Sequence, residues 1–231
     1  MKRKGADYHH GDLRRALVEA TSRLVEEYGL EGFTLRAAAR LAGVSDGAPY
    51  HHFADREALL AAVAEHGFRK LCDEMSESAE RERGGPQRKG VAMGVAYVLF
   101  AARNPARFRL MFGPLVHSKD RYPELAEAAE RAYDLVRTGI GQSAYERPYR
   151  MPARGAVLNR WALVHGLSML AIDGHLHQHA ATERSLKRLV SEAIEWLGGR
   201  EPPRERESGV PTSGRRPRLR EDRERPVATR R

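Results

Sequence analysis

Side chains that could do chemistry gather at two places in this 231-residue chain. The first is "GVSDGAPYHHF" (43–53), where a phenol and two imidazoles directly follow a glycine and a proline. Tyr50 and His51 can each donate a hydrogen bond to a phosphate oxygen or a base edge. Gly47 and Ala48 carry almost no side chain, so the start of a helix there can approach another surface, and its amide groups attract phosphate. This pattern predicts contact with nucleic acid.

The second place is "NRWALVHGLSML" (159–170). Trp161 and His165 are four residues apart and so share one helix face, which Leu158 continues, while Gly166 permits close approach of another helix. A cavity lined by aromatic and Met side chains, with one imidazole, suits a hydrophobic ligand that carries a polar group. The candidate lining residues are Tyr97, Phe100, Phe108, Met111, Phe112, Trp161, His165 and Met169. The alternative is that these side chains only pack in a core, as most buried apolar residues do.

Three histidines, His175, His177 and His179, raise the question of a metal site. His175 and His179 have a spacing that can place two imidazoles on one ion. No Cys or carboxylate lies at a spacing that completes the site, and the chain lacks a Gly-rich phosphate loop or a nucleophile elbow. We therefore expect no metal, no cofactor and no enzyme activity; a metal-dependent enzyme is the alternative that these histidines leave open.

Helices must position these side chains, because apolar residues recur every three or four positions. Thr34, Ser45 and Asp55 are candidate N-caps, and Gly29 and Gly43 are candidate stops. The helices predicted in the first part of the chain are 11–28, 35–42, 46–53 and 56–79.

The second half shows the same periodicity. Pro105 suits the first turn of a helix, where its missing N–H costs nothing, with Asn104 as the cap; Thr182 can cap the last helix. The helices predicted there are 91–103, one beginning at 105, 124–143, 153–179 and 183–197. No segment alternates polar and apolar residues between turn signals, so the predicted fold class is all-α, without a sheet.

A helix, a turn with glycine and a short helix have the spacing of a helix-turn-helix. Gly43 can take the left-handed conformation that the turn needs, Ala39 lets the two helices approach, and Val44 packs between them. The segment 46–52 is then an exposed recognition helix. Pro49 gives up only the bond from its own nitrogen to Ser45.

Residues 12–63 resemble the N-terminal domain of the tetracycline-repressor (TetR) family of bacterial regulators. The resemblance rests on "TLRAAARLAGVSDGAPYHHFADREALLAAV" (34–63), and above all on its Ala-x-x-x-Gly-Val-Ser element, Tyr50, Phe53 and the Asp55–Arg56 pair. It implies a homodimer on a near-palindromic operator in double-stranded DNA, with the third helix in the major groove. The second half is similar to a subgroup with a Trp-x3-His-Gly signature, which implies a ligand pocket and a dimer interface built from the last two long helices.

The family's DNA contacts transfer to individual positions of this chain. The resemblance implies that Thr34, Tyr50 and Arg56 hold phosphates, and that Ser45 caps the third helix beside a phosphate. Ala48 and Pro49 are expected to contact thymine methyl groups. The candidate DNA-binding residues are Thr34, Arg36, Ser45, Asp46, Gly47, Ala48, Pro49, Tyr50, His51 and Arg56.

Four parts follow from these patterns: a flexible basic arm (1–10), a DNA-binding domain (11–55), a helical ligand-binding and dimerisation domain (56–199) and a tail (200–231). The net charge of +9 comes mainly from the tail, which holds 11 Arg and 6 acidic residues and almost no large apolar ones. Such a composition predicts disorder. The most apolar run, 91–102, is too short to span a bilayer, so we expect a cytoplasmic protein without a membrane segment.

The expected function is a ligand-responsive repressor, released from its operator when a small hydrophobic molecule binds the second domain. An activator and a ligand-independent regulator are the alternatives, because the sign of regulation depends on where the operator lies.

Overall fold

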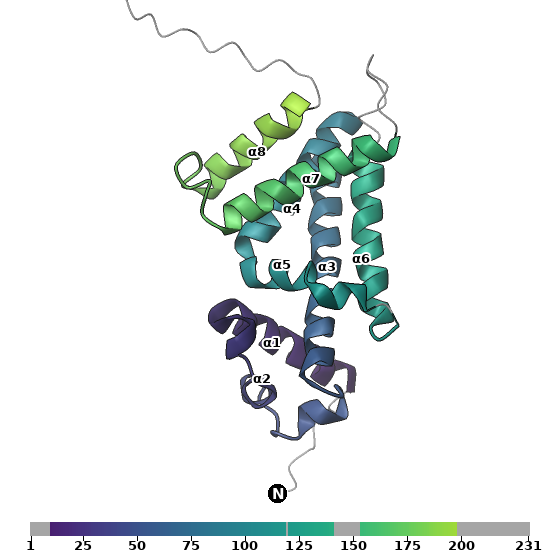
Figure 1. Cartoon of the computed structure of the whole chain (residues 1–231), viewed down its shortest axis with the longest axis vertical. Coiled ribbons are helices and arrows are strands. Elements are labelled where there is room, and N and C mark those ends of the chain that lie inside the picture. Colours follow the sequence, from purple (N-terminus) through teal and green to yellow (C-terminus); the bar gives the residue numbers. More distant parts are fainter. Residues whose placement is uncertain (1–9, 119, 141–152, 198–231) are drawn as a thin grey trace, which may run out of the picture. The chain divides into compact units, whose positions relative to one another are not determined.

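A computed structural model describes residues 10–118, 120–140 and 153–197, and Figure 1 shows their arrangement. All regular structure in these ranges is helical, which confirms the predicted fold class. The predicted arm (except His10) and the tail lie outside the described residues, so both stay predictions. The elements are α1 (His10–Gly32), α2 (Leu35–Leu41), η1 (Ala48–His51), α3 (Arg56–Arg81), α4 (Pro86–Arg103), α5 (Pro105–Met111), η2 (Pro114–His117), α6 (Pro123–Leu135), η3 (Val136–Ile140), α7 (Ala153–Ile172) and α8 (Glu183–Leu197).

The turn between α2 and η1 has the predicted geometry. Thr34 caps α2, since its Oγ1 accepts a hydrogen bond from the Ala37 amide at 3.1 Å. Gly43 adopts a left-handed φ of 73°, which favours glycine. The Val44 amide then donates to the Ala39 carbonyl at 3.0 Å, and Ala39 is fully buried. Local sequence therefore determines how the chain leaves α2.

The prediction of a helix over 46–53 was wrong. The chain forms a single 3-10 turn, η1, and Gly47 rather than Ser45 occupies the capping position, without a side-chain hydrogen bond. Pro49 explains the difference, because it lacks the N–H that an α-helix would direct to the Ser45 carbonyl. That carbonyl instead accepts from the Ala48 amide at 3.0 Å, in the shorter three-residue pattern.

The long helix α3 follows η1 and runs from the helix-turn-helix into the second half of the chain (Figure 1). Asp55 caps it as predicted, with Oδ1 2.7 Å from the Ala58 amide. Its buried side chains include Leu59 near the start and Phe68 and Met75 farther along, so one helix contributes to the packing of both halves.

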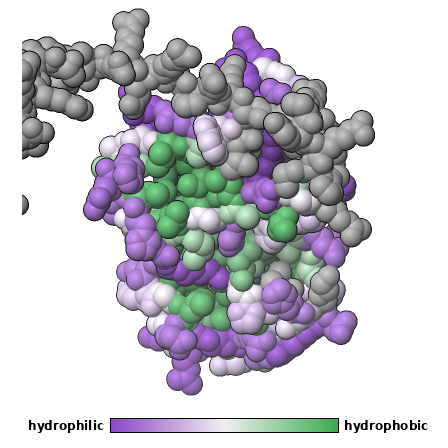
Figure 2. Space-filling model, turned by 45° about the horizontal axis from the view of Figure 1, so that its top comes forward, coloured by the Kyte–Doolittle hydropathy of each residue, from purple (hydrophilic) through white to green (hydrophobic). Residues whose placement is uncertain are grey.

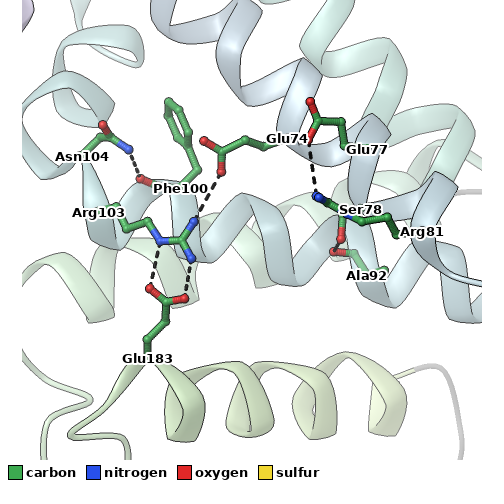
Figure 3. Close-up of polar contacts among 9 residues, drawn as sticks. All are labelled: Glu74, Glu77, Ser78, Arg81, Ala92, Phe100, Arg103, Asn104 and Glu183. Carbon is green, nitrogen blue, oxygen red and sulfur yellow. Dashed lines mark hydrogen bonds and ion pairs between the residues drawn. The ribbon is translucent and has the colours of Figure 1, made fainter.

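Several helix ends in the second half differ from the predicted ones. α4 begins at Pro86, because proline suits the first turn. Asn104 precedes α5 but does not cap it; its Nδ2 donates to the Phe100 carbonyl at 2.8 Å instead (Figure 3). α6 ends at Leu135 and continues only as the wider turn η3. α7 ends at Ile172 rather than at 179, since Gly174 takes a positive φ of 78°.

A small polar network joins α3, α4 and α8 (Figure 3). Arg103, the last residue of α4, donates Nε to Glu183 Oε2 at 2.9 Å and also pairs with Oε1 of that carboxylate. Its Nη1 lies 3.8 Å from Glu74 on α3. Ser78 Oγ donates to the Ala92 carbonyl at 3.0 Å, one turn farther along. Arg103 thereby connects three helices through one planar guanidinium.

The predicted close helix approach at Gly166 is absent within the described chain, where nothing lies within 4 Å of a Cβ built there. The close approach occurs at Gly94 instead. A Cβ at Gly94 would lie 2.6 Å from Ile194 Cδ1 and 3.2 Å from Val164 Cγ1, so α4, α7 and α8 meet at this position.

One carboxylate of α1 caps a helix of the second half. Glu26 Oε2 accepts from the Ala106 amide at 3.1 Å, and Oε1 accepts from the Arg107 amide at 2.9 Å. These amides belong to the first turn of α5, where intrahelical partners are missing. The carboxylate also complements the positive end of the helix dipole.

Candidate functional site

The tip of the helix-turn-helix presents two polar rings to solvent. Tyr50 is 58% exposed and His51 is exposed beside it, while Phe53, directly after the turn, is buried at 4%. Pro49 is buried as well, so it packs inside the domain and is not available for the predicted contact with a thymine methyl group. η1 therefore rests on Pro49 and Phe53 and directs Tyr50 and His51 outward.

The remaining predicted DNA-binding residues surround this tip. Thr34 is exposed at the start of α2, where its hydroxyl already caps the helix. Ala48 is partly exposed in η1. The other residues in the turn and on α2 are exposed, and these are Arg36, Ser45, Asp46 and Gly47. The structure thus places the predicted residues of α2, the turn and η1 together at one end of the helix-turn-helix, with Pro49 buried among them.

Arg56 has partners inside the protein. Its Nη2 donates to the Leu30 carbonyl at the end of α1, and its guanidinium lies 4.9 Å from the centre of the Phe33 ring. The side chain is exposed, but these contacts hold it against the segment between α1 and α2. Its predicted contact with phosphate stays a prediction.

An ion-pair cluster at the start of α3 was not predicted from the sequence. Arg121, in the segment before α6, donates to Asp55 Oδ2 at 2.6 Å and to Glu57 Oε1 at 3.0 Å. The Tyr122 hydroxyl donates to the same Glu57 oxygen at 3.1 Å. Partial burial, together with this bond to a carboxylate, raises the pKa of Tyr122 to about 12. Nothing in the local sequence pairs residues so far apart in the chain.

The second half contains an apolar cavity of about 450 Å³. This volume is in the range that binds small molecules in proteins. Side chains from α3, α4, η2, α6, η3 and α7 and the residue after α5 form its walls. The lining residues are Phe68, Tyr97, Phe112, His117, Ala129, Ala132, Tyr133, Val136, Leu158, Trp161, Ala162 and His165.

Half of the predicted ligand-binding residues lie in this wall, namely Tyr97, Phe112, Trp161 and His165. The others belong to the alternative reading, in which such residues only pack. Phe100, Phe108 and Met111 are almost completely buried in the core, and Met169 is partly buried against it.

The wall contributed by α6 and the first residue of η3, Val136, was missed. Ala129, Ala132, Tyr133 and Val136 recur at helical spacing, so the sequence does place them on one face. That signal does not reveal which helix they face, and small alanines do not suggest a binding site. Phe68 of α3 was also predicted only as part of an apolar helix face.

A pair of polar groups lies deep in the cavity. The Tyr97 hydroxyl and His165 Nδ1 are 3.1 Å apart. Burial raises the pKa of Tyr97 and lowers the pKa of His165. Both groups are therefore uncharged at neutral pH, and the His165 ring packs edge-on against Phe112, with centroids 4.7 Å apart at 70°.

A larger hollow, of about 650 Å³, lies between α3, α4 and α8. It contains none of the predicted ligand-binding residues, and charged side chains of both signs line it. Arg103 and Glu183, which are among them, already pair with each other. The apolar cavity is the better candidate for a ligand site, because apolar walls with few polar groups are typical of such sites.

The histidines considered for a metal site lie beyond the end of α7. His175, His177 and His179 are exposed residues in successive turns, so the helical spacing on which the metal reading depended is not present. Within residues 10–118, 120–140 and 153–197, no three His, Cys, Asp or Glu side chains gather in a way that could hold a metal ion.

Comparison with known proteins follows the two halves of the chain. Residues 17–63 match the model of bacterial regulatory proteins of the tetR family, and residues 91–193 match a tetracyclin repressor-like C-terminal domain. The HTH-type transcriptional regulator BetI of Paraburkholderia xenovorans is 35% identical over 79 residues, which are 34% of this chain and 40% of that relative. The chain thus matches less than half the length of this curated relative.

Solved structures match over most of the chain. A protein of unknown function from Rhodococcus sp. RHA1 is 32% identical, with a TM-score of 0.69 over 83% of this chain and 96% of that one. The transcriptional regulator FadR from Bacillus subtilis, solved in complex with stearoyl-CoA, shares the fold at 14% identity, with a TM-score of 0.60 over 80% of this chain and 97% of that one. The two family models and the helix-turn-helix identify this chain as a transcriptional regulator that belongs to the TetR family.

Proposed function

We propose that the protein is a homodimeric repressor that binds a near-palindromic operator and is released when a small hydrophobic molecule fills the apolar cavity. The observation that carries the proposal is the course of α3. This helix begins three residues after Phe53, the buried residue that supports the exposed Tyr50 and His51 of η1, which we call the reading tip. Farther along, the same helix contributes Phe68 to the cavity wall. A ligand that favours another position of α3 would change the spacing of the two reading tips in a dimer.

The proposed homodimer accounts for the composition of α7. By length and composition alone, the 18-residue segment Gly155–Ile172 of α7 could cross a membrane, and it is longer than the apolar run 91–102 noted in the sequence. Only 22% of this segment is buried. Leu158 and Leu170 are exposed on it, and Trp196 is exposed at the end of α8. Figure 2 shows apolar surface gathered on one face between hydrophilic residues. A second copy packed against α7 and α8 would cover such surface.

The relatives support parts of this proposal. The BetI relative is an HTH-type transcriptional regulator, and residues 17–63 of this chain match the model of bacterial regulatory proteins of the tetR family. The FadR structure contains a ligand, stearoyl-CoA, within the same fold. A regulator that acts on DNA works in the cytoplasm of a bacterium, which is the location we propose. An activator, or a regulator that needs no ligand, would use the same reading tip and differ only in operator position or in the role of the cavity.

The test is binding to DNA from upstream of the protein's own gene, measured by fluorescence anisotropy at several salt concentrations. Tyr50→Ala removes a proposed phosphate contact, so we expect affinity to fall by about tenfold or more. Tyr28→Ala is the matched control, because Tyr28 is also 58% exposed but lies on α1, away from η1. It should bind like the wild type.

Equal affinity of Tyr50→Ala and the wild type would contradict the proposed reading tip. A chain ending at Gly199 separates the contribution of the Arg-rich tail. If this truncation abolishes binding while Tyr50→Ala has no effect, the affinity for DNA belongs to the tail.

A further inference from the structure

The side chains that line the apolar cavity restrict the charge of a ligand that can bind there. Rings dominate its walls, and none of its described lining residues is a Lys, Arg, Asp or Glu. A charged ligand group buried without a partner of opposite charge is strongly disfavoured. The walls therefore favour an uncharged ligand.

The hydrogen bonds in the cavity fix which group faces that ligand. Tyr97 is almost completely buried, and His165 Nδ1 is the one hydrogen-bond acceptor for its hydroxyl within the described part of the chain. Because a buried hydroxyl needs an acceptor for its hydrogen, the Tyr97 hydroxyl donates to His165 Nδ1, 3.1 Å away. Neutral His165 then carries its proton on Nε2. In the described part of the chain, His165 Nε2 has no hydrogen-bond partner.

The rings set the shape of the ligand. Tyr133 and Trp161 meet edge to face, with centroids 5.7 Å apart at 81°, and Phe112 meets His165 in the same manner. Walls built from both ring edges and ring faces allow a flat aromatic body to stack on one wall and meet another edge-on. A ligand with a flexible aliphatic chain would bury as much apolar surface, but it would not make these oriented contacts with the rings.

We propose that the effector is a neutral, largely aromatic molecule with one hydrogen-bond acceptor, such as a carbonyl oxygen, which accepts from His165 Nε2–H. This inference deepens the proposed function and rests on it for the consequence of binding. A cationic aromatic ligand is the main rival, because ring faces attract cations. It would leave the His165 donor unpaired and would meet no carboxylate among the described lining residues.

The experiment uses four naphthalene probes of similar size and the full chain without DNA. They are 2-acetylnaphthalene (neutral, with an acceptor), 2-ethylnaphthalene (neutral, without one), 2-naphthoate and (2-naphthylmethyl)trimethylammonium. In isothermal titration calorimetry, we expect the ketone to bind about fivefold more tightly than the hydrocarbon. We expect it to bind about tenfold more tightly, or better, than either ion. An ion that binds as tightly as the ketone would overturn the proposal without any variant being made.

Two variants place the effect at His165. His165→Phe should keep hydrocarbon binding and lose the preference for the ketone, whereas His117→Phe, a change of the same kind at another histidine of the wall, should keep it. A ketone preference that survives in His165→Phe would overturn the assignment of the donor. The chain has two tryptophans, so Trp196→Phe leaves Trp161 as the sole indole, and quenching of its fluorescence should report occupation of the cavity.

Release of DNA is measured separately, by adding the ketone to the complex with operator DNA. If the ketone preference holds but the protein binds no operator, the proposed function fails and the ligand class stands. If the operator binds but the ions and the ketone bind alike, the proposed function stands and the ligand class fails.

Discussion

Asp55 has two separable roles, and their magnitudes lead to a quantitative prediction. Its Oδ1 caps α3 through the Ala58 amide, and its Oδ2 pairs with Arg121. Loss of an N-cap costs about 1 kcal/mol. The ion pair is about half exposed on both sides, so it contributes only about 0.5 kcal/mol. Asp55→Ala should therefore lower the free energy of unfolding by about 1.5 kcal/mol.

Asp55→Asn is the discriminating variant, since Asn caps helices as well as Asp does but carries no charge. It should lose only about 0.5 kcal/mol, and this loss should disappear in about 1 M salt, which screens exposed pairs. The assay is urea unfolding followed by far-UV circular dichroism at one fixed protein concentration, because a dimer's stability depends on concentration. If Asp55→Asn is as destabilising as Asp55→Ala, or if salt removes the loss in Asp55→Ala, the assignment of the cap is wrong.

Three further outcomes are expected. Gly94→Val should cost about 2 kcal/mol in urea unfolding, because its side chain would overlap Ile194; an unchanged midpoint would refute the packing at this position. Gly166→Leu should fold normally but shift the protein towards monomer in analytical ultracentrifugation, whereas Gly85→Leu, which also meets nothing within 4 Å, should not. Burial lowers the pKa of His165 below 6.5, so the unfolded chain binds a proton there first. The burial of neutral His165 therefore stabilises the fold fully above pH 6.5, and this stabilisation is lost as the pH falls below 6.5. The free energy of unfolding of His165→Phe should fall less steeply with decreasing pH than that of the wild type. Equal slopes for the two proteins would contradict this expectation.

Predictions that depended on neighbouring residues were the most accurate. Thr34, Asp55 and Thr182 cap their helices as predicted, the last with Oγ1 3.1 Å from the Ser185 amide. The left-handed turn at Gly43 was predicted as well. Caps and turns are formed within about four residues, so local sequence contains the information that they need.

Errors arose where two local rules competed or where the partner lay far away in the chain. At 46–53 the capping preference of Ser45 favoured an α-helix, whereas the missing N–H of Pro49 disfavoured it. The structure has a 3-10 turn there, so the effect of Pro49 was the larger one. In the cavity, the α7 face with Trp161 and His165 was predicted, but the α6 wall was not, because a single sequence shows that a helix has an apolar face without showing what that face packs against. The pairing of Arg121 with Asp55 escaped prediction for the same reason.

The capping of α5 by Glu26 has a consequence for the building of hybrid regulators. A hybrid that joins a foreign DNA-binding domain to residues 56–199 of this chain would remove Glu26 and leave the Ala106 and Arg107 amides without their acceptor. The two halves are thus not freely exchangeable parts. A donor domain that carries a carboxylate at the position of Glu26 should be grafted successfully more often than one without it, and restoring that carboxylate is the first repair to make in a hybrid that fails to fold.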